Sequence, residues 1–451
     1  MLGCLPALLN RFGVAWVEVG IHQGRLRALQ FLVSLLTYIA IGYVIDHIAA
    51  IKVFVTFLLF QVIVMSLCAF IFDISTLYIA SALIGFVCCN RVAAKCVAFQ
   101  LSNESNTPEV LNYGLSTPSN LAALLGPTIG GYLALPTIQY PQVFQHILFF
   151  RRFPVWLPSI LIESMLLITF LLSFSVLCRL AKSKQKEEQR NQQESLLPSD
   201  AITQDFPTES YDPDSTSQSY VDDEKHWSLR NCIDFIIQRH IISLFVAKFL
   251  CRLSGSLLPK LYSLWALTPH SDGGMGYSPK ESANLTAWAS ALLFLVDLVV
   301  PSFILRLLGY KTSLYASLIT LSLVISMFWF PARMENKNVA FVAILSALIV
   351  ARVFTTIVRV AAWAMLKNII PKKILGRVMA VESCLLSACS ILGELMVGNC
   401  FSWSLSNVKE TSGYVMFPMN EPFTFYLLSM LAVFGSFAAS ICSKDAEKSL
   451  L

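Results

Sequence analysis

Long runs of apolar residues alternate with short polar segments along nearly the whole chain. A helix needs about 20 predominantly apolar residues to cross the hydrocarbon core of a bilayer, and eleven runs reach this length. The pattern therefore predicts an all-α protein that crosses a membrane eleven times. The runs cover approximately residues 27–46, 52–71, 76–100, 116–135, 155–178, 240–266, 283–307, 312–330, 338–366, 375–403 and 422–442.

One long polar segment divides these runs into two blocks. From Ala181 to Asn231 the chain is rich in Ser, Gln, Asp, Glu and Pro, a composition that buries too little apolar surface to order itself. The sequence therefore predicts two helical bundles of five and six spans joined by a linker. The predicted parts are an N-terminal bundle (1–180), a disordered linker (181–237), a C-terminal bundle (238–442) and a short tail (443–451).

Basic residues indicate how the chain is oriented in the membrane. Lys and Arg are dense at the start of the linker, near Arg179 and Lys182, and again from Lys367 to Arg377. Connections rich in Lys and Arg lie on the cytosolic side of membrane proteins. The linker and the C-terminal tail are therefore expected in the cytosol, and the N-terminus on the opposite side.

The composition agrees with a membrane protein and disfavours other classes. Hydrophobic residues make up 56% of the chain, charged residues 14%, and the mean hydropathy is +0.65. The net charge of +5 is scattered, so no nucleic-acid partner is expected. The twelve cysteines show no CxxC pair and no Cys/His ligand spacing, so we expect no metal site and no cofactor. No nucleophile and base pattern or Gly-rich phosphate loop indicates an enzyme.

The segment GYVIDHIAAIK, Gly42 to Lys52, follows the first span and resembles the loop signature of the major facilitator superfamily. Gly42 and Asp46 match that signature, and Lys52 keeps one nearby positive charge. Such a segment supplies a tight turn and a carboxylate that can cap or pair across the bundle interface; a simple acidic turn is the alternative. The two-bundle plan is also similar to this superfamily, in which two bundles rock about a site near the membrane midplane.

A second motif lies in the fourth apolar run. The segment GPTIGG resembles the antiporter signature of the fifth helix in the same superfamily. The residues that match the signature are Gly126, Pro127, Gly130 and Gly131. Glycines at these positions let a neighbouring helix approach closely, and the proline bends the helix. A generic packing face of small residues is the alternative interpretation.

The stretch from Gly126 to Glu163 resembles the zinc-induced-facilitator-like branch of this superfamily in plants and fungi. The shared features are GGYLALP, Tyr140-Pro141 and the FPVWLP entry into the next helix; YSLWA at 262–266 and the segment 375–404 add to the resemblance. The match begins near LLNRFGVAW, and the superfamily's first helix has no counterpart in the ten residues ahead of it. The chain is therefore expected to carry the equivalents of helices 2–6 and 7–12.

Six basic residues lie inside the predicted spans, where charges are costly and commonly mark a transport pathway. They occur in pairs on single helix faces, because residues four or seven apart share a face. Each could instead be a side chain that extends from near a helix end to the membrane surface. The candidate substrate pathway consists of Arg91 and Lys95, Lys248 and Arg252, and Arg352 and Arg359.

Four acidic residues in the spans are candidates for proton coupling: Glu163, Asp297, Glu382 and Glu394. A carboxylate near a cation in a cavity can exchange a proton as access to the cavity alternates. The alternative is a static ion pair that holds two helices together.

The excess of cations predicts a small anionic substrate, since arginine binds carboxylates in bidentate fashion. The resembling branch exports or sequesters small organic compounds, including chelates, with proton coupling. We therefore expect a monomeric, multi-pass, proton-coupled antiporter for an organic anion or metal chelate, in the vacuolar or plasma membrane. A non-transporting membrane protein with a binding or regulatory role is the alternative.

Overall fold

The computed structural model describes residues 8–9, 12–13, 16–122, 125, 133, 136–144, 146–195, 229–268, 274–277, 279–410 and 422–441. Within these ranges the regular structure is helical throughout, with no strand. The all-α prediction is therefore confirmed. The described part contains ten helical segments long and apolar enough to cross a membrane. They coincide with ten of the eleven predicted spans, and the remaining one, 116–135, lies largely outside the described residues.

Within the described residues, the N-terminal bundle contains four long helical segments and several short ones. Its helices are α2 (Trp16–His47), α3 (Ala50–Cys68), α4 (Ile74–Val87), α5 (Asn90–Leu101), η2 (Glu104–Asn106), α6 (Thr107–Leu111), the π-helical turn η3 (Asn112–Ser116), α8 (Pro136–Gln139), α9 (Pro141–Phe144), α10 (Leu148–Arg152) and α11 (Trp156–Ser195).

The described part of the C-terminal bundle contains six long helices. Its elements are α12 (Leu229–Ile236), α13 (Arg239–Leu267), α14 (Pro279–Leu308), α15 (Tyr310–Met327), η6 (Phe330–Arg333), α16 (Lys337–Ile369), η7 (Lys372–Ile374), α17 (Leu375–Glu410) and α18 (Phe423–Ser440).

Local sequence explains where several of these helices begin. Asp73 and Thr76 form a reciprocal capping box at the start of α4, and the side chain of Asn336 accepts a hydrogen bond from Asn338 at the start of α16. Such caps satisfy backbone N–H groups that lack a partner within the helix. Gly309 separates α14 from α15 with a φ of 77°, a conformation that favours glycine.

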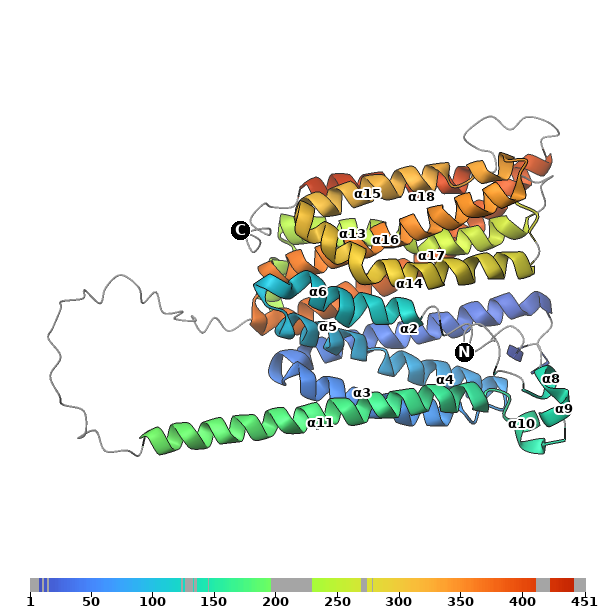
Figure 1. Ribbon diagram of the computed structural model, residues 1–451. Helices are drawn as coiled ribbons and strands as arrows, with labels where there is room; N and C mark the ends of the chain where they lie inside the picture. Colours follow the sequence, from blue (N-terminus) through green and yellow to red (C-terminus); the bar gives the residue numbers. More distant parts are fainter. Residues whose placement is uncertain are drawn as a thin grey trace.

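Helix α11 continues beyond the predicted membrane span. The span covers Trp156–Arg179, whereas the helix runs to Ser195, into the segment that the sequence assigns to the linker. The added residues are mainly Lys, Glu, Gln and Arg, which are good helix formers. In Figure 1 the helix therefore projects well past the ends of its neighbours.

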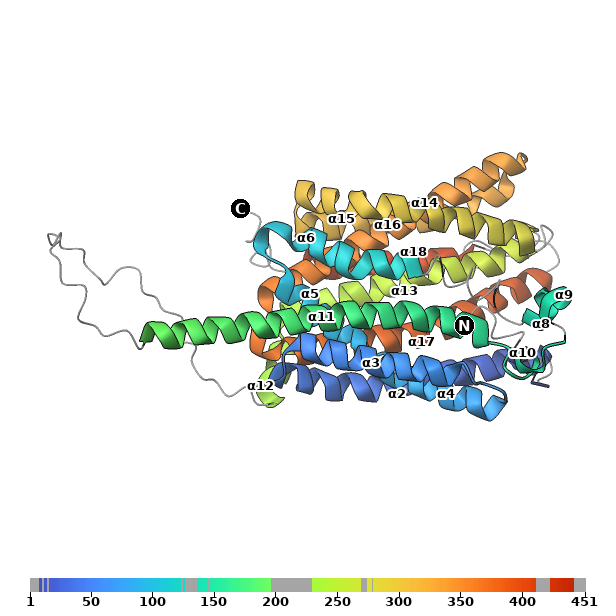
Figure 2. The ribbon, with the colours of Figure 1, turned by 60° about the horizontal axis from the view of Figure 1, so that its bottom comes forward.

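The two bundles lie side by side, with α13–α18 in one and α2–α4 and α11 in the other (Figures 1 and 2). Contacts between them run from α2 and α5 to α17, and from α6 to α14 and α16. We call the end of the bundles from which α11 projects, and where the loops at 48–49, 102–106 and 370–374 lie, the linker end. It is the end predicted to face the cytosol.

Two glycines allow α2 and α17 to meet at the linker end. A Cβ atom on Gly42 would lie 2.5 Å from the Cβ of Ala380 and 2.9 Å from the backbone oxygen of Gly376. A Cβ atom on Gly376 would in turn lie 2.7 Å from the Asp46 carboxylate. The close approach of these helices across the bundle interface therefore requires glycine on both sides.

Replacing Gly42 by alanine should force α2 away from α17 and lower the stability of the protein. Overpacking a tight contact typically costs about 1–3 kcal/mol, so we expect Gly42→Ala to lower the midpoint of thermal unfolding in detergent. Gly114→Ala is the matched control, because a methyl group there would lie 4.0 Å from its nearest neighbour, Ala98. An unchanged midpoint for Gly42→Ala would contradict the close packing.

Candidate functional site

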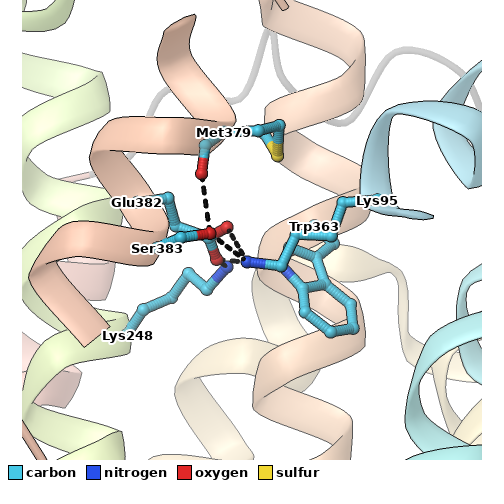
Figure 3. Close-up of polar contacts among 6 residues, drawn as sticks. All are labelled: Lys95, Lys248, Trp363, Met379, Glu382 and Ser383. Atoms are coloured by element: carbon cyan, nitrogen blue, oxygen red, sulfur yellow. Dashed lines mark hydrogen bonds and ion pairs between the residues drawn. The ribbon is translucent and has the colours of Figure 1, made fainter. Parts of the chain in front are cut away.

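A cluster of charged and polar side chains joins the two bundles about two helical turns inside the linker end. Glu382 of α17 pairs with Lys95 of α5 and Lys248 of α13 (Figure 3). The Nζ atom of Lys95 lies 2.7 Å from Oε2 of Glu382 and 2.9 Å from Oγ of Ser383. Trp363 donates its indole N–H to Oε1 of Glu382 at 2.9 Å. We call these five residues the inter-bundle cluster.

The inter-bundle cluster is buried and carries an excess of positive charge. Lys95, Lys248 and Glu382 are 8%, 5% and 1% exposed. The ring of Trp363 lies 5.8 Å from the Lys95 nitrogen and 5.0 Å from the Lys248 nitrogen, within cation–π range. Two ammonium groups share one carboxylate, so the formal charge of the cluster is +1. Only Lys95 belongs to the N-terminal bundle.

A second group of charges lies deeper between the bundles, on α14 and α16. Arg352, Thr356 and Arg359 lie on one face of α16 because they are spaced by four and three residues. The carboxylate of Asp297 on α14 is fully buried and lies within electrostatic range of both arginines. Asn120 donates a hydrogen bond to its Oδ2 atom at 2.5 Å. One carboxylate therefore faces two guanidinium groups.

Two further arginines come one from each bundle. Arg91 lies one turn from Lys95 on α5, and Arg252 lies one turn from Lys248 on α13. Both side chains are exposed to solvent, and Arg252 lies within electrostatic range of Arg91 and Arg359. Neither forms an ion pair with a carboxylate of the described residues. We call Arg91, Arg252, Arg352 and Arg359 the arginine group.

The predicted pathway cations thus lie in two neighbouring groups. Lys95 and Lys248 occupy the inter-bundle cluster, and the four arginines lie one or more turns further from the linker end. Glu382 and Asp297 are the two carboxylates found among them in the described part of the chain. Six cations against two carboxylates leave a formal excess of four positive charges between the bundles.

The remaining sequence candidates lie elsewhere. Glu163 accepts a hydrogen bond from Ser66 at 2.5 Å, at the contact of α11 with α3 within the N-terminal bundle. Asp46 accepts from the backbone N–H of Gly376 at 2.7 Å and pairs with Nε of Arg377 at 2.9 Å. Asp46 therefore caps α17 across the bundle interface. The side chain of Glu394 and the motif residues Gly126, Pro127, Gly130 and Gly131 lie outside the described residues.

Sequence reasoning did not single out several neutral partners of these charges. They include Trp363 and Ser383 in the inter-bundle cluster, and Thr356 and Asn120 beside Asp297. Asn112 is a further one, since its amide donates to the backbone oxygen of Asp297 at 2.8 Å. The sequence spacing could have identified Thr356 and Trp363, because they lie on the same helix face as Arg352 and Arg359. The asparagines gave none, because their partner is 177 or more residues away in the sequence.

No group of three or more His, Cys, Asp or Glu residues in the described part of the chain is arranged to hold a metal ion. The residues that meet between the bundles are instead organised to compensate and present positive charge. Arginine and lysine side chains of this kind can donate charge-assisted hydrogen bonds to an anion.

Two bundles of membrane-length apolar helices that meet around a charged interior define a multi-pass integral membrane protein. The chain belongs to the Major Facilitator Superfamily, which it matches over residues 4–394. Solved structures share the fold. The outward conformation of the transporter FucP superposes with a TM-score of 0.61 over 98% of this chain and 96% of FucP, at 15% identity. A bacterial homologue of the iron transporter ferroportin gives the same score at 14% identity, over 97% of this chain and 93% of its own.

Several curated proteins are similar in sequence. A probable peptide/nitrate transporter of Arabidopsis thaliana is 23% identical over 329 residues, which cover 71% of this chain and 63% of the relative. Zinc Induced Facilitator-like 1 from the same plant is 24% identical over 71% of this chain and 62% of its own length. The fungal transporter psiT2 of Psilocybe cubensis is 29% identical over 47% of this chain and 40% of its own. The resemblance seen in the sequence is confirmed, and these relatives are transporters, not enzymes. The chain covers just under two thirds of the first two relatives' lengths.

Removing the carboxylate of the inter-bundle cluster should destabilise the protein. Glu382→Gln leaves two buried ammonium groups without a counter-charge, and breaking a buried pair in this way costs about 3–5 kcal/mol. We expect a clearly lower midpoint of thermal unfolding in detergent. The triple variant Lys95→Met, Lys248→Met, Glu382→Met should recover most of the loss, because it removes all three charges. A triple variant as unstable as Glu382→Gln would contradict this electrostatic origin.

Proposed function

We propose that this protein is a secondary active transporter that carries a small organic anion, or an anionic metal chelate, by alternating access. Membership of the superfamily supports transport, in which two bundles rock about a site near the membrane midplane. The arginine group lies between the bundles, about 15 Å or more from the linker end along its helices. This position supports the arginine group as the substrate site of the proposed carrier.

The excess of positive charge is the observation that carries the choice of substrate. Charges inside a membrane protein are costly unless they are compensated. Asp297 lies within electrostatic range of Arg352 and Arg359, and neither Arg91 nor Arg252 pairs with a carboxylate of the described residues. A bound anion would supply the missing counter-charge, and arginine can hold a carboxylate with two parallel hydrogen bonds. A free metal cation would be repelled. One relative is named a probable peptide/nitrate transporter, and nitrate is an anion.

We further propose that substrate movement is coupled to protons and that Asp297 is the coupling carboxylate. Glu382 is already matched by two lysines, so its negative charge is balanced without a proton. Asp297 instead lies beside the arginine group, where an incoming anion competes with it for the same guanidinium groups. Loss of this partner would favour protonation of Asp297, so the anion and a proton would bind together. This arrangement supports movement of both in the same direction, in place of the antiport expected from the sequence. We expect the carrier to act as a monomer in the vacuolar or plasma membrane.

Uptake into proteoliposomes under an imposed proton gradient tests the function. We expect substrate-dependent proton flux with one or more organic acids or metal chelates. Arg352→Ala should lower kcat/KM about 10- to 100-fold, because it removes a hydrogen bond between charged groups. Arg352→Lys should lose less, since it keeps the charge. Lys337→Ala is the control, because Lys337 is an exposed residue at the far end of the same helix. Transport by Arg352→Ala at normal affinity would overturn the cationic site, and a folded wild-type chain that moves none of these compounds would favour the non-transporting alternative.

Asp297→Asn should separate transport from proton coupling. The amide cannot carry a proton between the two sides, so uphill uptake driven by the pH gradient should fall at least about tenfold. Exchange of labelled for unlabelled substrate should persist, because it needs no net proton movement. Glu163→Gln is the control, since Glu163 contacts Ser66 within the N-terminal bundle. Retention of gradient-driven uptake by Asp297→Asn would exclude Asp297 as the coupling residue.

A further inference from the structure

We propose that Lys95, Lys248 and Glu382 form a reversible latch that holds the linker end closed. In this latch Lys95 fastens the two bundles together, and Lys248 allows them to part again. The proposal rests on the transport function proposed above, because it describes how access to the same central site is regulated.

Lys95 is held entirely by groups of the other bundle. Its ammonium group contacts the carboxylate of Glu382 and the hydroxyl of Ser383, both on α17, and it lies over the ring of Trp363 on α16. When the bundles separate at the linker end, Lys95 must leave all three partners at once. The contact therefore stabilises the closed linker end selectively and contributes nothing when that end is open.

Lys248 behaves differently because it moves with Glu382. Helix α13 packs against both α16 and α17 within the C-terminal bundle, so Lys248 and the indole N–H of Trp363 stay on Oε1 of Glu382 in both states. After Lys95 has left, Glu382 is still matched by one cation. Without Lys248, opening would leave a carboxylate with no counter-charge, which is strongly unfavourable.

The second lysine also weakens the closed state. Lys95 and Lys248 approach the same carboxylate from two sides and repel each other. Opening relieves this repulsion and leaves a one-to-one pair behind. The two lysines therefore act in opposite directions on one equilibrium, although both bind Glu382: Lys95 favours the closed linker end and Lys248 favours the open one.

Distance measurements by pulsed electron spin resonance in nanodiscs test this opposition. Spin labels can be attached to unnatural side chains placed at Asn103 and Lys373, which are exposed at the linker end on opposite bundles. This labelling leaves the twelve native cysteines in place. The ratio of long to short distances between the labels reports the fraction of molecules whose linker end is open, and it needs neither substrate nor transport.

Lys95→Met should raise the ratio of open to closed molecules about tenfold or more, and Lys248→Met should lower it by a similar factor. The double variant Lys95→Glu, Glu382→Lys tests the charges directly. It places the carboxylate on the N-terminal bundle and two lysines on the C-terminal one, so opening would leave the lysines unpaired. The closed state should then be at least as populated as in the wild type.

Equal ratios in the wild type and both methionine variants, or shifts of both in the same direction, would overturn the latch. A variant that fails to elute as a folded monomer is replaced by Lys95→Gln or Lys248→Gln, for which the same opposite shifts are expected. The distance readout separates this proposal from the proposed function. Opposite shifts without anion transport would support the latch alone, whereas anion transport without these shifts would reject the latch alone.

Discussion

In the proposed transport cycle, a carboxylate buried between two bundles that move apart must remain compensated throughout the motion, and Glu382 is under this constraint. Its position between α5, α13 and α16 fixes which side chains those helices can carry at that depth. Two lysines and one indole N–H satisfy it. The glycines that bring α2 against α17 act with it, because the close approach at Gly42 and Gly376 draws α17 toward the N-terminal bundle. The glycines thus set how closely α2 and α17 approach, and the cluster sets which side chains meet across the bundle interface.

The arginine group depends on this arrangement because it lies directly beyond the cluster. Glu382 is paired with the two lysines, so Asp297 is the carboxylate that lies within electrostatic range of Arg352 and Arg359. Asn112 and Asn120 hold α14 at Asp297 from the N-terminal bundle. The positive excess between the bundles is therefore a property of the assembled structure and depends on how each carboxylate is already paired.

The sequence predicted the helices well because membrane crossing imposes a length and a hydrophobicity on each of them. It also singled out the six basic residues as candidates, since charges inside apolar runs are conspicuous. It did not predict that these residues form two separate groups. Lys95 and Lys248 are spaced like the arginines, and only the fold brings Glu382 into contact with both lysines. Glu163 had the same sequence signal as Asp297, yet it lies at the contact of α11 with α3. The neutral partners were missed because Asn, Ser and Thr are common in membrane helices for many reasons, and their partners are distant in the chain.

Three helices each carry one residue of the cluster and one of the arginine group, spaced by four. The pairs are Lys95 with Arg91 on α5, Lys248 with Arg252 on α13, and Trp363 with Arg359 on α16. Residues four apart lie on one face, about one turn or 6 Å along the axis. A helix turn is rigid on this scale, so a movement that withdraws Lys95 from Glu382 must also displace Arg91 relative to Arg252. The same rigid displacement would therefore change both the closure of the linker end and the spacing of the arginines proposed to hold an anion. No further structural element is needed to couple the proposed latch to the proposed anion site.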